Sequence, residues 1–139
     1  MSEEIVRQQT PLAEFGGGAN RLRTSLNLDD PKQRQRMVAT FNDCDAQITE
    51  IIGQKIMVTD YVLHDAQFRG KADGEMVAGI RLVLIDKDGL TYQTTGETLL
   101  RSFQRIVYGW GEPPWTTPLA LTPRTKKKGE RSIYWFDVG

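Results

Sequence analysis

The spacing of apolar residues changes once within residues 76–107, and this change constrains the fold more than any other feature of the sequence. At first every second residue is apolar, as in Ile80, Leu82 and Leu84, with Ala78 before them. This alternation predicts a strand with one buried face. Further on, apolar residues recur every three or four positions, at Leu99, Leu100, Phe103, Ile106 and Val107. That spacing is typical of an amphipathic helix, so a strand and a helix follow one another closely.

A turn and a short second strand separate these two parts. Residues 86–89 read Asp-Lys-Asp-Gly. Aspartate hydrogen-bonds to nearby backbone groups, and Gly89 accepts the positive φ that a hairpin loop requires. Residues 90–94 are expected to return antiparallel. Thr95 can then cap a helix and Glu97 suits its positively charged first turn, so the hairpin leads directly into the helix.

Two further stretches predict strands. Residues 54–68 carry apolar groups on both faces, with Ile56, Val58 and Val62 on one face and Met57, Tyr61 and Leu63 on the other. Such a strand either lies in the middle of a sheet or bends and serves two sheets. Residues 117–125 and 131–138 predict a second hairpin, with its turn around residues 126–129. The last of these strands is aromatic and β-branched, as strands prefer.

The N-terminal part predicts an arm and then a helix. Residues 1–28 carry few large apolar side chains and contain three consecutive glycines, which favours an extended or mobile arm. A helix is expected from Asp30 and Pro31 to about residue 43, because aspartate caps helices and proline fits their first turn. Its apolar stripe is narrow and consists of Met37, Val38 and Phe41. Residues 44–52 either prolong this helix or form a second short one.

These elements predict one mainly β domain at residues 53–139, preceded by a helical segment at 29–52 and the arm at 1–28. The order of its elements is β-β-β-α-β-β. This is the order of the OB-fold, a five-stranded Greek-key barrel whose second and third strands and adjoining loops face oligonucleotides. The N-terminal helix is an addition to that barrel.

Composition limits the chemistry and the location that we expect. The 139 residues include one histidine, His64, and one cysteine, Cys44, so neither an internal disulfide nor a metal-ligand cluster is expected. No apolar run approaches the roughly 20 residues of a membrane-spanning helix, and the acidic residues 1–4 differ from a signal peptide. We therefore expect a cytoplasmic protein with no metal, no cofactor and no membrane partner.

The positive charge is gathered near the C-terminus. Lysine and arginine together number 18, and so do aspartate and glutamate, which gives a net charge of zero. Residues 101–139 nevertheless contain 7 basic and 3 acidic side chains, against 11 and 15 in residues 1–100. Because the net charge is zero, the protein is not expected to coat nucleic acid by bulk charge, and the distribution of charge matters more than its sum.

Four segments resemble single-stranded-DNA-binding proteins of bacteriophages and related mobile elements. They read IDKDGLTY at 85–92, TT at 94–95 leading into LLRSF at 99–103, GWGEPPW at 109–115, and KKGERSIYWF at 127–136. The resemblance covers roughly residues 53–139. It implies an OB-fold and sequence-tolerant binding of strands displaced during replication or recombination in a bacterial host cell, without enzymatic activity. Replication or recombination proteins are further partners to consider, and a homo-oligomer is an open alternative.

Binding a single strand requires flat aromatic faces for the bases and cations along the phosphates. The candidate aromatic residues are Tyr134, Tyr92, Trp110, Trp115, Trp135 and Tyr61. The candidate cations are Lys126, Lys127, Lys128, Arg131, Arg69 and Lys71. Neighbours in a strand point to opposite faces, so only one of Tyr134 and Trp135 can be outward, and Tyr134 is the first choice. The alternatives are that the tryptophans anchor a loop and that the lysines form a solubilising turn.

Two other functions remain in view. One is an OB-like adaptor that binds protein through residues 110–115 and does not bind nucleic acid; the neutral net charge favours it. The other is a metal-dependent hydrolase using Asp86 and Asp88, which the scattered carboxylates disfavour. His64 is interpreted as a polar residue near a strand end, and Cys44 has no expected catalytic base nearby.

Overall fold

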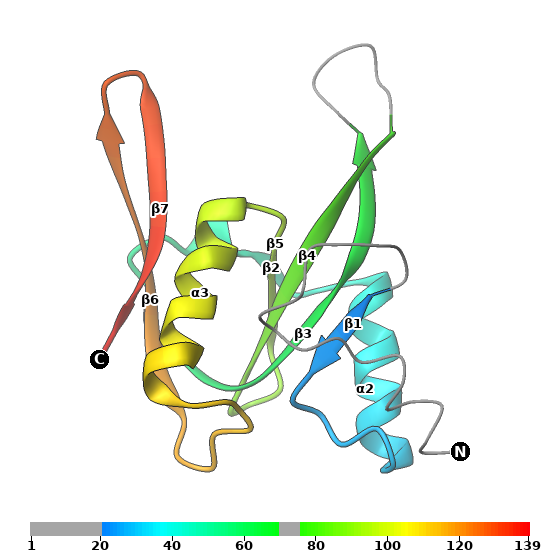
Figure 1. Cartoon of the computed structure of the whole chain (residues 1–139). Helices are drawn as coiled ribbons and strands as arrows, with labels where there is room; N and C mark the ends of the chain where they lie inside the picture. Colours follow the sequence, from blue (N-terminus) through cyan, green and yellow to red (C-terminus); the bar gives the residue numbers. More distant parts are fainter. Residues whose placement is uncertain (1–20, 70–75) are drawn as a thin grey trace.

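The computed structural model describes residues 21–69 and 76–139, and Figure 1 shows how their elements are arranged. The strands are β1 (Leu22–Thr24), β2 (Ala46–Gln47), β3 (Ile56–Arg69), β4 (Met76–Asp86), β5 (Thr91–Thr94), β6 (Leu119–Lys128) and β7 (Arg131–Val138). The α-helices are α2 (Pro31–Asn42) and α3 (Glu97–Trp110), and a 3₁₀ helix covers Ile48–Ile51. The prediction of a mainly β protein is confirmed. Within these ranges, no helix has both the length and the apolar character needed to cross a bilayer.

The described strands form one curled, mixed sheet that makes a half-barrel beside α3 (Figure 1). Its order is β2-β5-β4-β3-β6-β7, and β1 pairs with β3 outside this path. The β2–β5 pair is parallel and the other pairs are antiparallel. From β3 to β7 the chain follows the predicted order of three strands, one helix and two strands.

Strand β3 is central and bent, as its two apolar faces predicted. One side pairs with β4 along most of its length. On the other side, residues 56–58 pair with β6, whereas residues 62–64 pair with β1. The register against β4 shifts between Val58 and Asp60, which marks a β-bulge at the bend. One strand thus serves both halves of the curled sheet.

The bulge overturns the predicted assignment of faces on β3. An extra residue in a strand reverses which side chains face the core beyond it. Ile56 and Val58 therefore share the main core with Tyr61 and Leu63, while Val62 belongs to the opposite face. The sequence-based grouping of Val62 with Ile56 was wrong for this reason.

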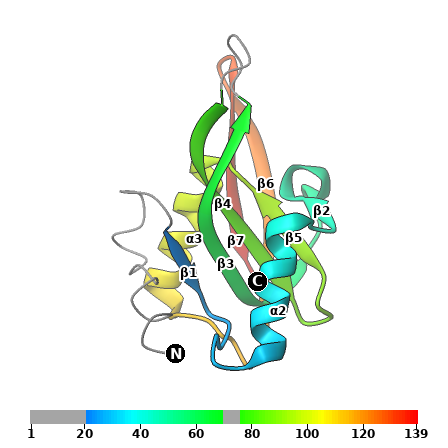
Figure 2. The same cartoon turned by 90° about the vertical axis from the view of Figure 1, so that its right-hand side faces the viewer.

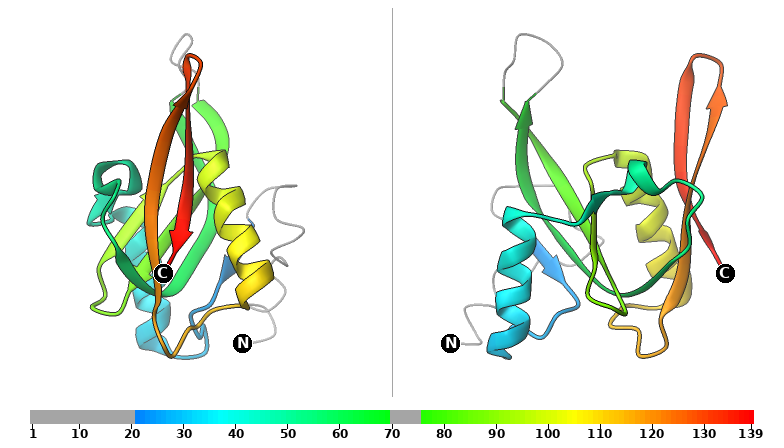
Figure 3. Two further views of the ribbon diagram at one scale, coloured as in Figure 1. Left: turned by 90° about the vertical axis from the view of Figure 1, so that its left-hand side faces the viewer. Right: turned by 180° about the vertical axis from the view of Figure 1, so that it is seen from behind.

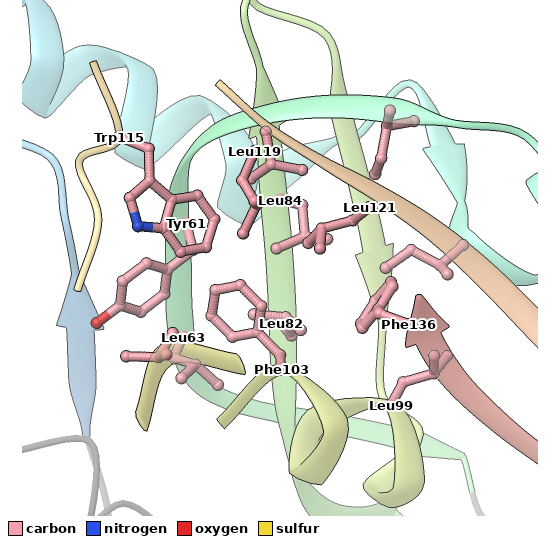
Figure 4. Packing of buried hydrophobic residues seen from close by; sticks show 14 of the residues in the cluster. Tyr61, Leu63, Leu82, Leu84, Leu99, Phe103, Trp115, Leu119, Leu121 and Phe136 are labelled. Carbon is pink, nitrogen blue, oxygen red and sulfur yellow. The ribbon is translucent and has the colours of Figure 1, made fainter. Parts of the chain in front are cut away.

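The main core fills the space between the concave side of the sheet and α3 (Figure 4). Leu82 and Leu84 point into it from β4, and Leu99, Phe103 and Val107 point into it from α3. The rings of Tyr61 and Phe103 lie 5.3 Å apart between their centroids, and those of Phe103 and Trp115 lie 6.2 Å apart. The predicted apolar faces of β4 and α3 are both confirmed at these positions.

Helix α2 covers the other face of the sheet (Figure 2), and a second apolar cluster lies on that face. It consists of Leu26, Leu28, Met37, Val62, Val83 and Ile85, with Leu22 and Cys44 at its edge. The prediction of only one buried face on β4 was therefore wrong. The arm prediction was also wrong for residues 21–28, because two leucines enter this cluster and β1 pairs with β3. Residues 1–20 lie outside the described residues.

Helix α2 begins as predicted but packs differently. The Asp30 side chain accepts a hydrogen bond of 3.0 Å from the Lys32 backbone N–H, and Pro31 occupies the first turn. Met37 is buried, whereas Val38 and Phe41 are 48% and 37% exposed, so the predicted stripe was only partly correct. The chain does not continue this helix through residues 44–52. It forms β2 and the 3₁₀ helix instead.

Two hairpin turns connect β4 to β5 and β6 to β7. Between β4 and β5, the Asp86 carboxylate accepts hydrogen bonds from the Asp88 and Leu90 backbone N–H groups, and Gly89 has the predicted positive φ. Between β6 and β7, Lys128 pairs with Arg131 and the turn is Gly129-Glu130. The three lysines were predicted in this turn. They lie on β6, because the positive φ of Gly129 lets the chain reverse within two residues.

Candidate nucleic-acid interface

Hairpin β6–β7 extends beyond the N-terminal end of α3 and away from the half-barrel, as both views in Figure 3 show. Its two strands and turn carry five basic side chains, Arg124, Lys126, Lys127, Lys128 and Arg131. Only two acidic side chains, Glu130 and Asp137, accompany them. The hairpin thus has an excess of three positive charges in a chain whose net charge is zero. Such a concentration attracts phosphates at short range.

The strand register gathers most of these cations on one face, together with an aromatic ring. Arg124 pairs directly with Trp135, and Lys128 pairs with Arg131. Because side chains alternate along a strand, Arg124, Lys126 and Lys128 share the face that carries Trp135. The Lys126 Nζ lies 5.8 Å from the centroid of the Trp135 ring. This distance is typical of a cation–π contact.

Trp135 is oriented by a second contact on the same face. Its indole Nε1–H donates a hydrogen bond of 3.3 Å to Asp137 Oδ1. The other carboxylate oxygen, Asp137 Oδ2, accepts a bond of 3.0 Å from Arg124 Nε. Trp135 is half-buried, so part of its ring surface remains open to solvent. A half-open indole ring between cations suits a nucleobase that stacks while its phosphate contacts a lysine.

Tyr134, the first choice from the sequence, faces the other way. It shares a face with Phe136, which is buried in the main core, and it packs against that core. The Phe136 backbone N–H donates a hydrogen bond of 2.8 Å to Ser102 Oγ on α3, which fixes this face toward the helix. The prediction that one of the two aromatics belongs to the core is therefore confirmed. The choice of Tyr134 as the outward one was wrong.

Two other predicted aromatics are core residues. Tyr61 is fully buried, and its hydroxyl donates a bond of 3.2 Å to Glu112 Oε1. Burial raises the pKa of Tyr61 well above its ordinary value, and the nearby Glu112 charge adds to this. Trp115 is buried against Phe103, and its indole N–H donates to the Gly111 carbonyl at 3.2 Å. Neither ring is open to a base, so both predictions were wrong on grounds of burial.

The remaining predicted residues are dispersed. Tyr92 lies on the core side of β5, half-buried, and its hydroxyl donates to Asp86 Oδ2 at 3.0 Å. Burial, and then this bond to a carboxylate, raise the pKa of Tyr92 to about 12. Trp110 is 61% exposed, but it ends α3, whose last turn lies away from the tip of hairpin β6–β7 (Figure 1). Arg69 is the last residue of β3, and Lys71 lies outside the described residues.

Several exposed or unusual groups were missed. Tyr108 on α3 is 94% exposed, and it follows Arg101 and Arg105 at helical spacing on the solvent side. A helical projection of residues 97–110 contains this signal. The ring contact between Phe41 and His64 joins two elements that are distant in sequence, so no local pattern indicates it.

The comparisons with known proteins add no relative. No family model matches the chain, and no curated protein or solved structure matches it either.

Acidic residues do not assemble a metal site in residues 21–69 and 76–139, where no group of three potential ligand side chains is found. Asp86, the predicted hydrolase candidate, uses one carboxylate oxygen to close the β4–β5 turn and the other to hold Tyr92. Its neighbour Asp88 lies 3.4 Å from Lys87 Nζ. These carboxylates have structural partners already.

Proposed function

We propose that this protein binds single-stranded DNA without strong sequence preference. The outer face of hairpin β6–β7 is the observation that carries the proposal. There, Trp135 and the cations Arg124, Lys126, Lys128 and Arg131 lie on one surface. A base stacked on an indole and phosphates held by lysines account for tight binding without hydrogen bonds to base edges.

The order of the strands supports the proposal, because it matches that of an OB-fold. Five strands follow the sheet order β5-β4-β3-β6-β7, and α3 connects β5 to β6 along the chain. Closing β5 against β7 would turn this half-barrel into the five-stranded Greek-key barrel that binds oligonucleotides in other proteins. The resemblance to phage proteins extends the proposal to displaced strands in replication or recombination, inside a bacterial host and with proteins of those processes as partners.

A titration with oligo-dT tests the proposal. Binding is expected to quench intrinsic tryptophan fluorescence, and Trp135→Ala is expected to weaken binding by about 1 to 3 kcal/mol. Trp110→Phe serves as the control, because Trp110 lies on α3 rather than on the hairpin. The proposal fails if oligo-dT does not bind, or if Trp135→Ala binds as tightly as the unchanged protein.

A protein-binding adaptor is the second candidate, and one observation favours it. Tyr108 and Trp110 are 94% and 61% exposed at the end of α3, on a surface without the basic residues of the hairpin. Exposed aromatic residues are enriched where proteins bind one another. If Trp110→Ala changes the binding of oligo-dT as strongly as Trp135→Ala does, this surface contacts DNA and the adaptor candidate is lost.

A further inference from the structure

His64 and Arg81 form an unusual pair on the face of the sheet that α2 covers. They are direct neighbours across β3 and β4. The Phe41 ring of α2 contacts the His64 ring in a tilted arrangement, with 4.6 Å between the two centroids and 60° between the planes. The Arg81 guanidinium donates from Nη1 to the Phe41 carbonyl oxygen at 3.4 Å. Phe41 itself is 37% exposed, and His64 and Arg81 are half-buried.

Two buried nitrogen atoms of this pair lack hydrogen-bond partners among the described residues, namely His64 Nε2 and Arg81 Nε. A carbonyl oxygen can only accept, so the contact of 2.8 Å between His64 Nδ1 and the Asp65 carbonyl requires Nδ1 to carry the proton. Burial lowers the pKa of His64, which keeps the ring neutral. His64 Nε2 is then a free acceptor and Arg81 Nε–H a free donor, on residues that pair directly across β3 and β4.

A free donor and a free acceptor on two paired residues, one of which contacts an aromatic ring, match the edge and the face of a nucleobase. Nucleobases present adjacent donors and acceptors along their edges and a flat surface for stacking. Buried polar groups without partners are rare, so each of them needs an explanation, and a bound molecule that supplies the missing partners is one. Rotation of the Phe41 side chain would open this site while its backbone carbonyl keeps the bond to Arg81.

We propose that His64 and Arg81 form a second base-binding subsite, which the Phe41 side chain covers in the free protein. The subsite rests on the proposed binding of single-stranded DNA and deepens it. The base displaces Phe41, stacks on the His64 ring, and hydrogen-bonds to His64 Nε2 and Arg81 Nε. The cover imposes a cost on binding, because only the open form accepts a base.

Removing the cover is the first test. Phe41→Ala is expected to bind oligo-dT about tenfold more tightly if the open form is about 10% populated. Val38→Ala, on the exposed side of the same helix, is the matched control and should leave affinity unchanged. The gain should disappear in Phe41→Ala/Arg81→Met. Equal or weaker binding by Phe41→Ala overturns the subsite.

The second test observes His64 directly and does not depend on a variant. The chain has a single histidine, so untagged protein gives one set of imidazole signals in an NMR spectrum. Saturating oligo-dT is expected to shift these signals. If oligo-dT quenches tryptophan fluorescence while the His64 signals stay unmoved, the subsite is wrong and the hairpin proposal stands. If neither signal responds, the proposed function itself fails.

Discussion

Asp86 shows how one carboxylate organises two elements. Its Oδ1 accepts two backbone N–H groups of the β4–β5 turn, and its Oδ2 accepts the Tyr92 hydroxyl from the returning strand. Asp86 is buried, so each missing bond would leave an unsatisfied charge. The sequence indicated the turn through Asp86 and Gly89. It could not indicate the bond to Tyr92, because that bond depends on how β5 pairs with β4.

The Tyr92–Asp86 bond should make stability depend on alkaline pH. The folded pKa of Tyr92, about 12, lies above its ordinary value of 10.0, so the folded state retains the proton more strongly. Its contribution is therefore complete below pH 10 and lost as pH rises through 12. Tyr92→Phe is expected to lose about 1 to 3 kcal/mol at pH 8, and less at pH 11 to 12, in urea unfolding. Tyr108→Phe is the control, and a pH-independent difference would contradict the assignment.

Phe103 is the central side chain of the main core, between Tyr61 and Trp115. It is fully buried, as is Leu82 on the facing strand. Phe103→Ala and Leu82→Ala are each expected to destabilise the protein by about 2 to 5 kcal/mol, because each leaves a cavity. Chemical unfolding measures the loss, with Val38→Ala as the exposed control. A loss below about 1 kcal/mol would mean that the core is not packed as described.

At the level of elements, residues 21–28 act as an integral part of the fold. Leu26 and Leu28 are buried, and the Thr24 hydroxyl donates to the Tyr61 carbonyl at 2.7 Å. A chain that begins at Asp29 is expected to lose about 3 to 6 kcal/mol relative to one that begins at Arg21, from the two leucines alone. Urea unfolding of the two chains gives the difference. Equal stability would mean that residues 21–28 contribute nothing to the fold, as expected of a mobile arm.

The elements also show which features local patterns can predict. Apolar spacing located β3, β4 and α3, because amphipathic periods follow directly from strand and helix geometry. The capping residues Asp30 and Pro31 located α2, and aromatic and β-branched composition indicated the last strand. The bulge after Val58 left no such trace, since both faces of β3 are apolar and either phase looks the same. The outward position of Trp135 was hidden for a similar reason. Alternation places Tyr134 and Trp135 on opposite faces, but only packing of Phe136 against Ser102 and α3 decides which face is inner.

At the scale of the whole molecule, the curled sheet lies between two other layers. Helix α3 covers one face of the curled sheet, and α2 with residues 22–28 covers part of the other (Figure 2). Hairpin β6–β7 projects beyond these layers with its basic residues exposed. Leu119, Leu121 and Phe136 of this hairpin belong to the main core, whereas its exposed basic side chains are left to bind a ligand.

The contributions of charge and of stacking to binding can be distinguished, because phosphate contacts change the salt dependence of binding and stacking does not. Replacing Lys126, Lys127 and Lys128 by alanine is expected to weaken binding of all single strands alike and to reduce the salt slope by up to about 2, since each phosphate contact releases about 0.7 counterion. Trp135→Ala is expected to weaken binding and leave the slope almost unchanged. Titrations of oligo-dT and a mixed-sequence strand at several salt concentrations measure both quantities.

The control for charge is the double variant Lys32→Ala/Lys87→Ala, which removes cations from α2 and the β4–β5 turn and should preserve the slope.

Lys126 contacts the Trp135 ring, so the effects of Lys126→Ala and Trp135→Ala on binding should not add. The variant Lys126→Ala/Trp135→Ala should lose less affinity than the sum of the two single losses. A triple-lysine variant with unchanged affinity and slope would reduce the basic residues to a solubilising role. The hairpin would then have to bind by stacking alone, which Trp135 with its single half-open ring cannot supply for more than one base.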